Sequence, residues 1–285
     1  MEELMEYLED IIDDVLDAFW NFLGGKLSFA FGTGIWNVMI DLISTTAGTT
    51  PEDFSSYAWN YVTNVVYDGC LSVAAMVLNI MYLIGLMRQA VKLRENYTAE
   101  MLVDSLIRVI ISNFGLINGL PLMKQFFGLA SKLALVFLNN NGSLHFEQKI
   151  NDLSSTLFYF LFGIVYLIVS LVCSALIFLA VYSRYMTLYF LVGVAPFAWM
   201  TLPGGIGVSN TFFSWLKMFI AKSLEIVAMA ILIGIGSALC SKIDFGTVDG
   251  IGRGAMQAIQ NLATMVLLTA SVKGIDITMR RMFGL

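Results

Sequence analysis

Charged residues are scarce in this 285-residue chain: Lys, Arg, Asp and Glu together make up 13% of it, whereas 58% is hydrophobic. Soluble domains carry about 25% charged residues, and the mean hydropathy here is +0.78. Four prolines and the lack of a long polar tract leave little room for a separate soluble domain. The composition excludes an ordinary soluble protein and predicts an all-α, polytopic membrane protein.

Catalytic and metal-binding patterns are absent as well. The sequence has one histidine, His145, and three cysteines in apolar runs without metal-ligand spacing: Cys70, Cys173 and Cys240. It contains no phosphate-binding GxxxxGK[ST] loop, no nucleophile elbow and no HExxH pattern. We therefore expect no enzyme activity, no metal site and no cofactor, so the energy for any transport would come from a partner.

What the sequence does contain is long apolar runs. The longest, residues 156–183, has no charged residue and would rise ~40 Å as a helix, enough to cross a hydrocarbon core of ~30 Å. We expect it to end at Arg184. The other predicted spans lie near residues 71–87, 101–138, 223–239 and 255–272. Glycines, asparagines and Pro121 interrupt 101–138, which is therefore expected to make one net crossing plus an amphipathic piece.

The first part of the chain differs from the rest. Eight carboxylates precede the first basic residue, Lys26, and apolar residues recur among them at helical spacing. Residues 1–53 are therefore predicted to form an N-terminal amphipathic or interfacial region on the non-cytoplasmic side, with an amphipathic helix and a second interfacial helix near 27–44. Residues 54–285 form the predicted transmembrane domain, which opens with a continuous helix over 54–90.

A second apolar run, residues 185–202, is broken by Pro196. Proline removes a backbone donor and clashes with the preceding turn, so this segment either dips into the bilayer and returns or crosses it with a kink. Basic clusters mark cytoplasmic ends. About five crossings, with the N-terminus outside and the C-terminus in the cytoplasm, place the strong basic clusters on the cytoplasmic side.

Several charges fall near or within the predicted spans. Asp104 and Arg108 are four residues apart on one helix face and are predicted to form an intramembrane pair. Lys222 and Glu225, three apart, can pair in the same way. These residues and Lys217 either line a hydrated path or subunit interface, or extend to the lipid headgroups, and the sequence leaves both alternatives open.

Small residues distinguish the span that begins near Ser223. Gly234 and Ala238 are four apart and permit close helix packing. With residues from the preceding segments, they make up the set of candidate hinge, lumen or interface residues: Arg184, Pro196, Trp215, Lys217, Lys222, Glu225, Gly234 and Ala238.

The block VYSRYMTLYFLVGVAPFAWMTLPGG, residues 181–205, and the helix SWLKMFIAKSLEIVAMAIL after it resemble the core of the TrbL-type proteins. These are polytopic inner-membrane subunits of conjugative type IV secretion systems. The shared features are an arginine after a long span (Arg184), an Ala-Pro pair in the next apolar run (Pro196), and a tryptophan opening a basic helix (Trp215, Lys217). The compact size and acidic N-terminus are similar to versions from Gram-positive mobile elements.

The resemblance implies a homo-oligomeric channel or scaffold subunit in the bacterial plasma membrane that helps to translocate single-stranded DNA with its relaxase. The implied partners are a secretion ATPase, other membrane subunits of the transfer complex, the lipid bilayer and single-stranded DNA in transit. A secondary transporter or small-solute permease is an alternative, but it would favour internal repeats and paired broken helices, and the sequence has one broken region. A non-conducting membrane scaffold is a third alternative.

Overall fold

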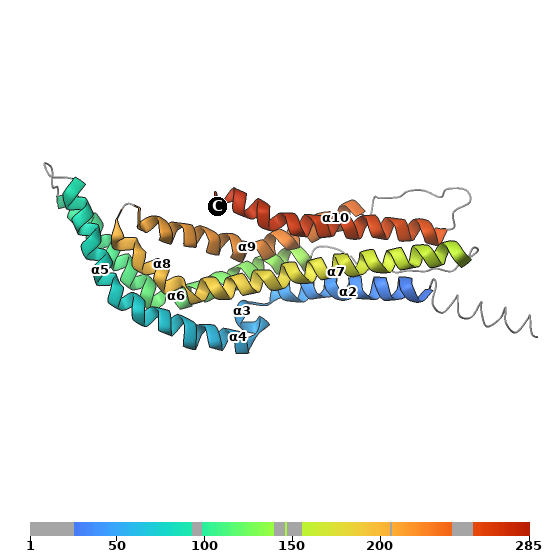
Figure 1. Ribbon diagram of the computed structural model, residues 1–285, viewed down its shortest axis with the longest axis horizontal. Coiled ribbons are helices and arrows are strands. Elements are labelled where there is room, and N and C mark those ends of the chain that lie inside the picture. The colour runs from blue at the N-terminus through green and yellow to red at the C-terminus, as the bar shows by residue number, and fades with distance from the viewer. Residues whose placement is uncertain (1–25, 93–98, 140–145, 147–155, 206, 241–252) are drawn as a thin grey trace, which may run out of the picture. The chain divides into compact units, whose positions relative to one another are not determined.

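The computed structural model describes residues 26–92, 99–139, 146, 156–205, 207–240 and 253–285. Over these ranges the chain forms helices and short connections and no strand, as Figure 1 shows, which confirms the all-α prediction. The predicted acidic N-terminal helix and His145 lie outside the described residues.

The described chain forms the following elements in order: α2 (Lys26–Gly48), α3 (Pro51–Phe54), α4 (Ser56–Tyr61), the π-helical η1 (Val62–Tyr67), α5 (Asp68–Lys92), α6 (Ala99–Asn139), α7 (Thr156–Gly193), α8 (Ala195–Thr201), the 3-10 turn η2 (Leu202–Gly204), α9 (Ser209–Cys240) and α10 (Arg253–Met282). Five helical stretches are long and apolar enough to cross a membrane: Ser56–Arg88, Val103–Leu138, Phe162–Gly193, Ser209–Leu239 and Met256–Met282. Each overlaps one predicted span. The chain is therefore a multi-pass helical membrane protein.

The long helices exceed what one crossing needs. α6 has 41 residues and α7 has 38. At 1.5 Å per residue these helices rise about 60 Å, roughly twice the thickness of a hydrocarbon core. Parts of both helices therefore lie beyond the hydrocarbon region or tilt strongly within it.

Two helices continue where the sequence predicted a stop. α7 passes through Arg184 and ends at Gly193, so the prediction that Arg184 ends the span is wrong. α6 is one unbroken helix that contains Pro121, so the predicted division of 101–138 into two pieces is wrong as well. Tertiary contacts described below accommodate Arg184 and the glycines of α6 that also suggested a stop.

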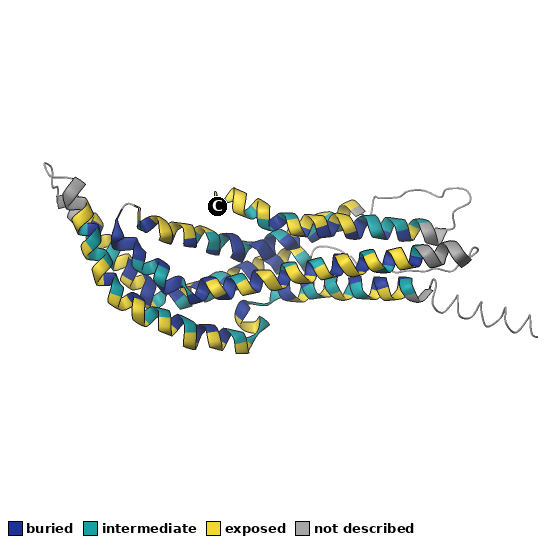
Figure 2. Cartoon of the chain, in the orientation of Figure 1, coloured by how far each residue is buried: buried dark blue, intermediate teal, exposed yellow. Residues whose placement is uncertain are grey.

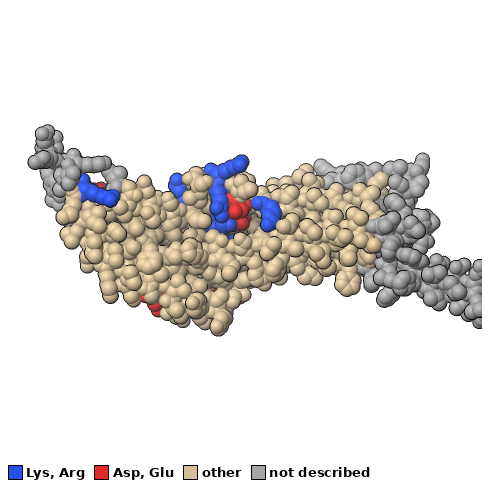
Figure 3. Space-filling model, viewed as in Figure 1, with Lys and Arg blue, Asp and Glu red and all other residues tan. Residues whose placement is uncertain are grey.

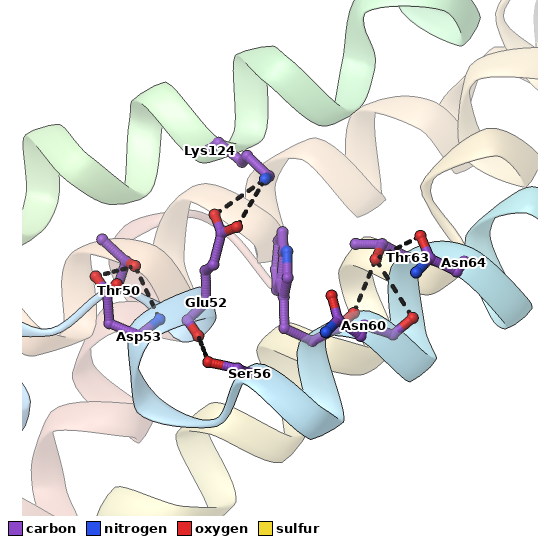
Figure 4. Close-up of polar contacts among 9 residues, drawn as sticks. Thr50, Glu52, Asp53, Ser56, Asn60, Thr63, Asn64 and Lys124 are labelled. Carbon is purple, nitrogen blue, oxygen red and sulfur yellow. Dashed lines mark hydrogen bonds and ion pairs between the residues drawn. The ribbon is translucent and has the colours of Figure 1, made fainter.

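The predicted helix over residues 54–90 is present from Ser56 onward, because α4, η1 and α5 follow one another without a break and Ser56–Arg88 is one candidate span. Ser55 is extended (φ −152°, ψ 97°), and its side chain accepts a hydrogen bond from the Ala58 amide, which begins α4. Thr50 caps α3 in the same way by accepting from the Asp53 amide at 3.3 Å (Figure 4). Side-chain caps of this type satisfy amides that have no partner within the helix, so the short α3 ends before Ser55 and the long helix begins after it.

The described contacts divide the chain into two compact units. Unit 1 comprises Met1–Thr45, Leu138–Ala180 and Ile231–Gly274, and unit 2 comprises Thr46–Phe137, Val181–Ala230 and Ile275–Leu285. Helices α2, α6, α7, α9 and α10 therefore contribute residues to both units. Figure 2 shows that buried and exposed stripes alternate along the helices, as expected where each helix has one packed face.

Unit 1 contains a close approach between α2 and α7. The Ser170 hydroxyl donates to the Gly32 carbonyl, and a Cβ atom added at Gly32 would lie 2.9 Å from the Tyr166 ring. The Phe29 and Tyr166 rings pack with their centroids 4.9 Å apart. Glycine is therefore required at this crossing for the helices to approach closely.

Candidate functional site

The candidate site lies in unit 2 and is organised by a bend between α7 and α9. α7 ends at Gly193, and α8 begins with Ala195 and Pro196, where proline's missing amide costs nothing because the first helical turn has no partner for it. Residues 185–193 of the predicted broken segment thus continue α7. The 7-residue α8 rises only about 10 Å, so it connects two spans and does not cross the membrane itself.

The connector, by which we mean α8 and η2, packs against glycines of α5 and α6. A Cβ atom added at Gly115 of α6 would overlap the Trp199 indole of α8, and one added at Gly85 of α5 would overlap the Pro203 carbonyl. The Ser112 hydroxyl donates to the Trp199 carbonyl at 2.5 Å. Residues that suggested a break in α6 are therefore contact positions that let the connector pack against an intact helix.

Trp215 joins the two long helices that the connector links. Its indole Nε1 donates to the Leu191 carbonyl at 3.0 Å, and the side chain is buried. Leu191 lies in the last turn of α7, whose final carbonyls have no intrahelical donor. Trp215 also stacks on Phe219, with centroids 5.5 Å apart. It thus caps α7 from a neighbouring helix, whereas Lys217, two residues further along α9, is exposed.

A cluster of ionisable side chains lies between α9 and the end of α10, and its α9 members are buried. Lys222 Nζ lies 2.9 Å from the Glu225 Oε2 atom and 2.8 Å from the Asp276 Oδ1 atom. Arg280 Nε lies 3.0 Å from the same Asp276 oxygen. Lys222 and Glu225 are only 5% and 3% exposed. The predicted Lys222–Glu225 pair is present, and the carboxylate from α10 makes it part of a larger network.

Arg184 completes this cluster, which we call the charge cluster: Arg184, Lys222, Glu225, Asp276 and Arg280. Arg184 is 3% exposed, its Nε donates to the Lys222 carbonyl at 3.4 Å, and its guanidinium lies 4.9 Å from the centre of the Tyr185 ring. Its Nη1 atom has no hydrogen-bond partner among the described residues. Three cations and two carboxylates give the charge cluster a formal charge of +1.

Ion pairs compensate the buried charges of the cluster and connect two helices. Removing charged groups from water costs several kcal/mol per ion, so charges stay buried only with partners of opposite sign. Lys222 bonds to carboxylates from two helices and therefore ties α9 to the end of α10. In Figure 3, most of the visible face is uncharged, and blue and red side chains gather near the C-terminus. Ionisable groups within candidate membrane spans are also a typical mark of a functional site.

The predicted Asp104–Arg108 pair forms on α6. Arg108 Nε donates to Asp104 Oδ2 at 3.0 Å, and the Nη2 atom lies 2.9 Å from the same oxygen. The Asp104 side chain is 53% exposed and that of Arg108 31% exposed, so the pair faces outward from unit 2. It is separate from the charge cluster.

The small residues of α9 pack differently from what their spacing suggested. Gly234 is buried, but Ala238 is exposed, so the two do not form one buried face. The close approach lies at Gly236, where an added Cβ atom would overlap the Leu268 side chain of α10 in unit 1. The spacing allowed packing within or between chains, so a contact of Gly234 and Ala238 with another chain stays a prediction.

Sequence reasoning missed two parts of the site. Asp276 carries the second carboxylate of the charge cluster, and its spacing of four from Arg280 is a signal that could have found the pair. Trp199 had no such signal, because only the folded chain shows which glycines it meets. The sequence matches no protein-family model and no curated protein. The functional interpretation therefore depends on the chemistry of the site and on the resemblance of residues 156–239.

Proposed function

We propose that the chain is a channel or scaffold subunit of a conjugative type IV secretion system, which oligomerises and helps to translocate single-stranded DNA with its relaxase across the bacterial plasma membrane. One observation supports this proposal above others. The residues that carry the resemblance belong to one packed piece of unit 2: Arg184 donates to the Lys222 carbonyl, and Trp215 donates to that of Leu191.

Physical requirements favour an oligomer with external partners. A hydrated path for DNA must be enclosed by protein on all sides, and one chain with five candidate spans does not provide a lumen of that width. The enclosing wall would therefore come from several copies. We propose that a secretion ATPase supplies the energy, since the sequence contains no nucleotide-binding motif.

Basic groups give a reason for DNA to approach. Lys217 is exposed on α9, and the nearby charge cluster carries one net positive charge. Phosphate attracts such groups strongly, with a steep dependence on salt concentration. In the proposed topology the N-terminus is outside, and the end of α10, with Arg280 and Arg281 in its last turn, faces the cytoplasm. An odd number of crossings is consistent with termini on opposite sides.

The test is gene deletion in a donor cell that carries the transferable element. Deletion should abolish transfer of the element to a recipient, and a plasmid copy of the gene should restore it. Formaldehyde crosslinking during transfer should then recover element DNA with the tagged protein. Unchanged transfer after deletion would overturn the proposal, and lost transfer without crosslinked DNA would favour the non-conducting scaffold.

A secondary transporter remains a second candidate because of one specific observation. Lys222 and Glu225 are ionisable, almost fully buried and within a candidate span, which is typical of ion-coupled transport sites. Purified protein in liposomes distinguishes the two functions. Uptake of a small solute driven by an ion gradient, and lost in the Glu225→Gln variant, would support transport and contradict the secretion proposal.

A further inference from the structure

The outward surface of α6 carries four polar residues and one isoleucine at a regular interval of seven. The positions concerned, which we call the α6 stripe, are Asp104, Ile111, Asn118, Gln125 and Lys132. Positions seven apart on an α-helix differ by only ~20° around the axis, so successive members of the stripe are neighbours along a line that winds slowly around the helix. All of them are exposed except Asn118, which is half-buried. Unit 2 therefore leaves this line of α6 uncovered.

Lipid is an unsuitable cover for the α6 stripe. The stripe lies within the candidate span Val103–Leu138, and charged or amide side chains in such spans almost always face protein or water. Asn118 Nδ2 donates to the Phe114 carbonyl of its own helix at 3.3 Å, which leaves its Oδ1 atom able to accept another bond. Gln125 is exposed at the middle of this region. These groups need a partner that unit 2 does not supply.

Leucines beside the stripe indicate what that partner is. Leu122 and Leu129 follow Asn118 and Gln125 by four residues each, so they lie next to the stripe on the same surface. Both leucines are exposed. The seam between two packed helices repeats apolar residues at heptad spacing, and a polar residue within the seam fixes the register of the two helices. Large apolar residues are not expected at these two positions on a surface that faces only water.

We propose that the α6 stripe packs against the α6 stripe of a second copy of this chain, with the two helices parallel. In a membrane oligomer the symmetry axis lies along the membrane normal, so equal residues of different copies meet at the same depth. Side-chain amides suit such a contact because each carries both a donor and an acceptor. Asp104 of one copy can likewise reach Arg108 of the other. This inference rests on the oligomer of the proposed function and identifies the surface that forms it.

Cysteine crosslinking in membranes tests the contact. In a background with Cys70→Ala, Cys173→Ala and Cys240→Ala, the variants Asn118→Cys and Gln125→Cys place a thiol on the stripe. Ile117→Cys is the matched control, since it is 77% exposed at the same depth but is turned by about 100° around the helix. Disulfide formation requires Cα atoms within about 7 Å, so oxidation with copper phenanthroline should give dimers on the order of tenfold faster at the stripe than at 117.

A third stripe variant with a conservative replacement keeps the test valid if Asn118→Cys or Gln125→Cys fails to fold. Ile111→Cys replaces an exposed apolar residue on the stripe and should also give disulfide-linked dimers. Native mass spectrometry of the cysteine-free protein then separates two failures. An oligomer without stripe crosslinks, or with equal crosslinking at 117, overturns the α6 contact and leaves the proposed function standing. A protein that contains one copy only overturns both.

Discussion

Removal of the Lys222 charge is the most informative single change to this protein. The Lys222 ammonium contacts Glu225 at 2.9 Å and Asp276 at 2.8 Å, so Lys222→Met leaves Glu225 buried without its closest cation. Breaking a buried pair in this way costs about 3–5 kcal/mol. Arg184 stays near Glu225, and Arg280 stays on Asp276, so we expect a loss of about 3 kcal/mol, at the lower end of that range.

A double-mutant cycle isolates the interaction. Replacing both members of a buried pair with apolar residues is often close to neutral, so Lys222→Met with Glu225→Met should recover much of the loss. The free energy of unfolding is measured by SDS titration in mixed micelles, with tryptophan fluorescence as the signal. Arg108→Met, which breaks the exposed pair on α6, is the control and should cost at most about 1 kcal/mol. A Lys222→Met protein as stable as wild type, or a double variant whose loss equals the sum of the two single losses, would refute the reasoning.

Other expectations concern close packing and are checked by the same titration. Gly115→Ala places a methyl group against the α8 tryptophan and should cost about 1–3 kcal/mol, whereas Gly128→Ala, with open space around it on the same helix, should be neutral or stabilise by up to about 1 kcal/mol. In unit 1, Gly32→Ala should destabilise to a similar degree and Gly34→Ala should not. Trp215→Phe removes the hydrogen bond to the last turn of α7 and should cost about 1 kcal/mol. Equal effects within either glycine pair, or an unaffected Trp215→Phe protein, would contradict the contacts described.

The apolar helices were predictable from composition because hydropathy reports directly which segments prefer lipid. The long run that begins at residue 156 and the shorter run after Ser223 both correspond to observed helices. Ion pairs between residues close in sequence were also predictable, because helical spacing alone brings together Asp104 with Arg108 and Lys222 with Glu225. Whether each pair is buried or exposed was not predictable, because this depends on which other helix covers it.

The errors share one physical cause. Arg184 suggested a membrane boundary because an isolated arginine in lipid is costly, but α9 supplies a carbonyl and the chain buries the side chain instead. Gly115 suggested a break in α6 because glycine is a poor helix former, but propensity is weak against the packing of Trp199 on that helix. Nothing in the sequence signalled the π-helical turn at Val62–Tyr67.

The most direct test of the proposed function is DNA transfer from a donor whose only copy of the gene encodes Lys222→Met with Glu225→Met. This variant is expected to fold, insert in the membrane and accumulate to the wild-type level, so any loss of transfer would reflect the charge cluster itself. We predict that transfer falls at least tenfold, on the order of the effect expected for loss of a functional ion pair in a membrane span. Transfer at the wild-type frequency would contradict a functional role for the charge cluster in DNA export.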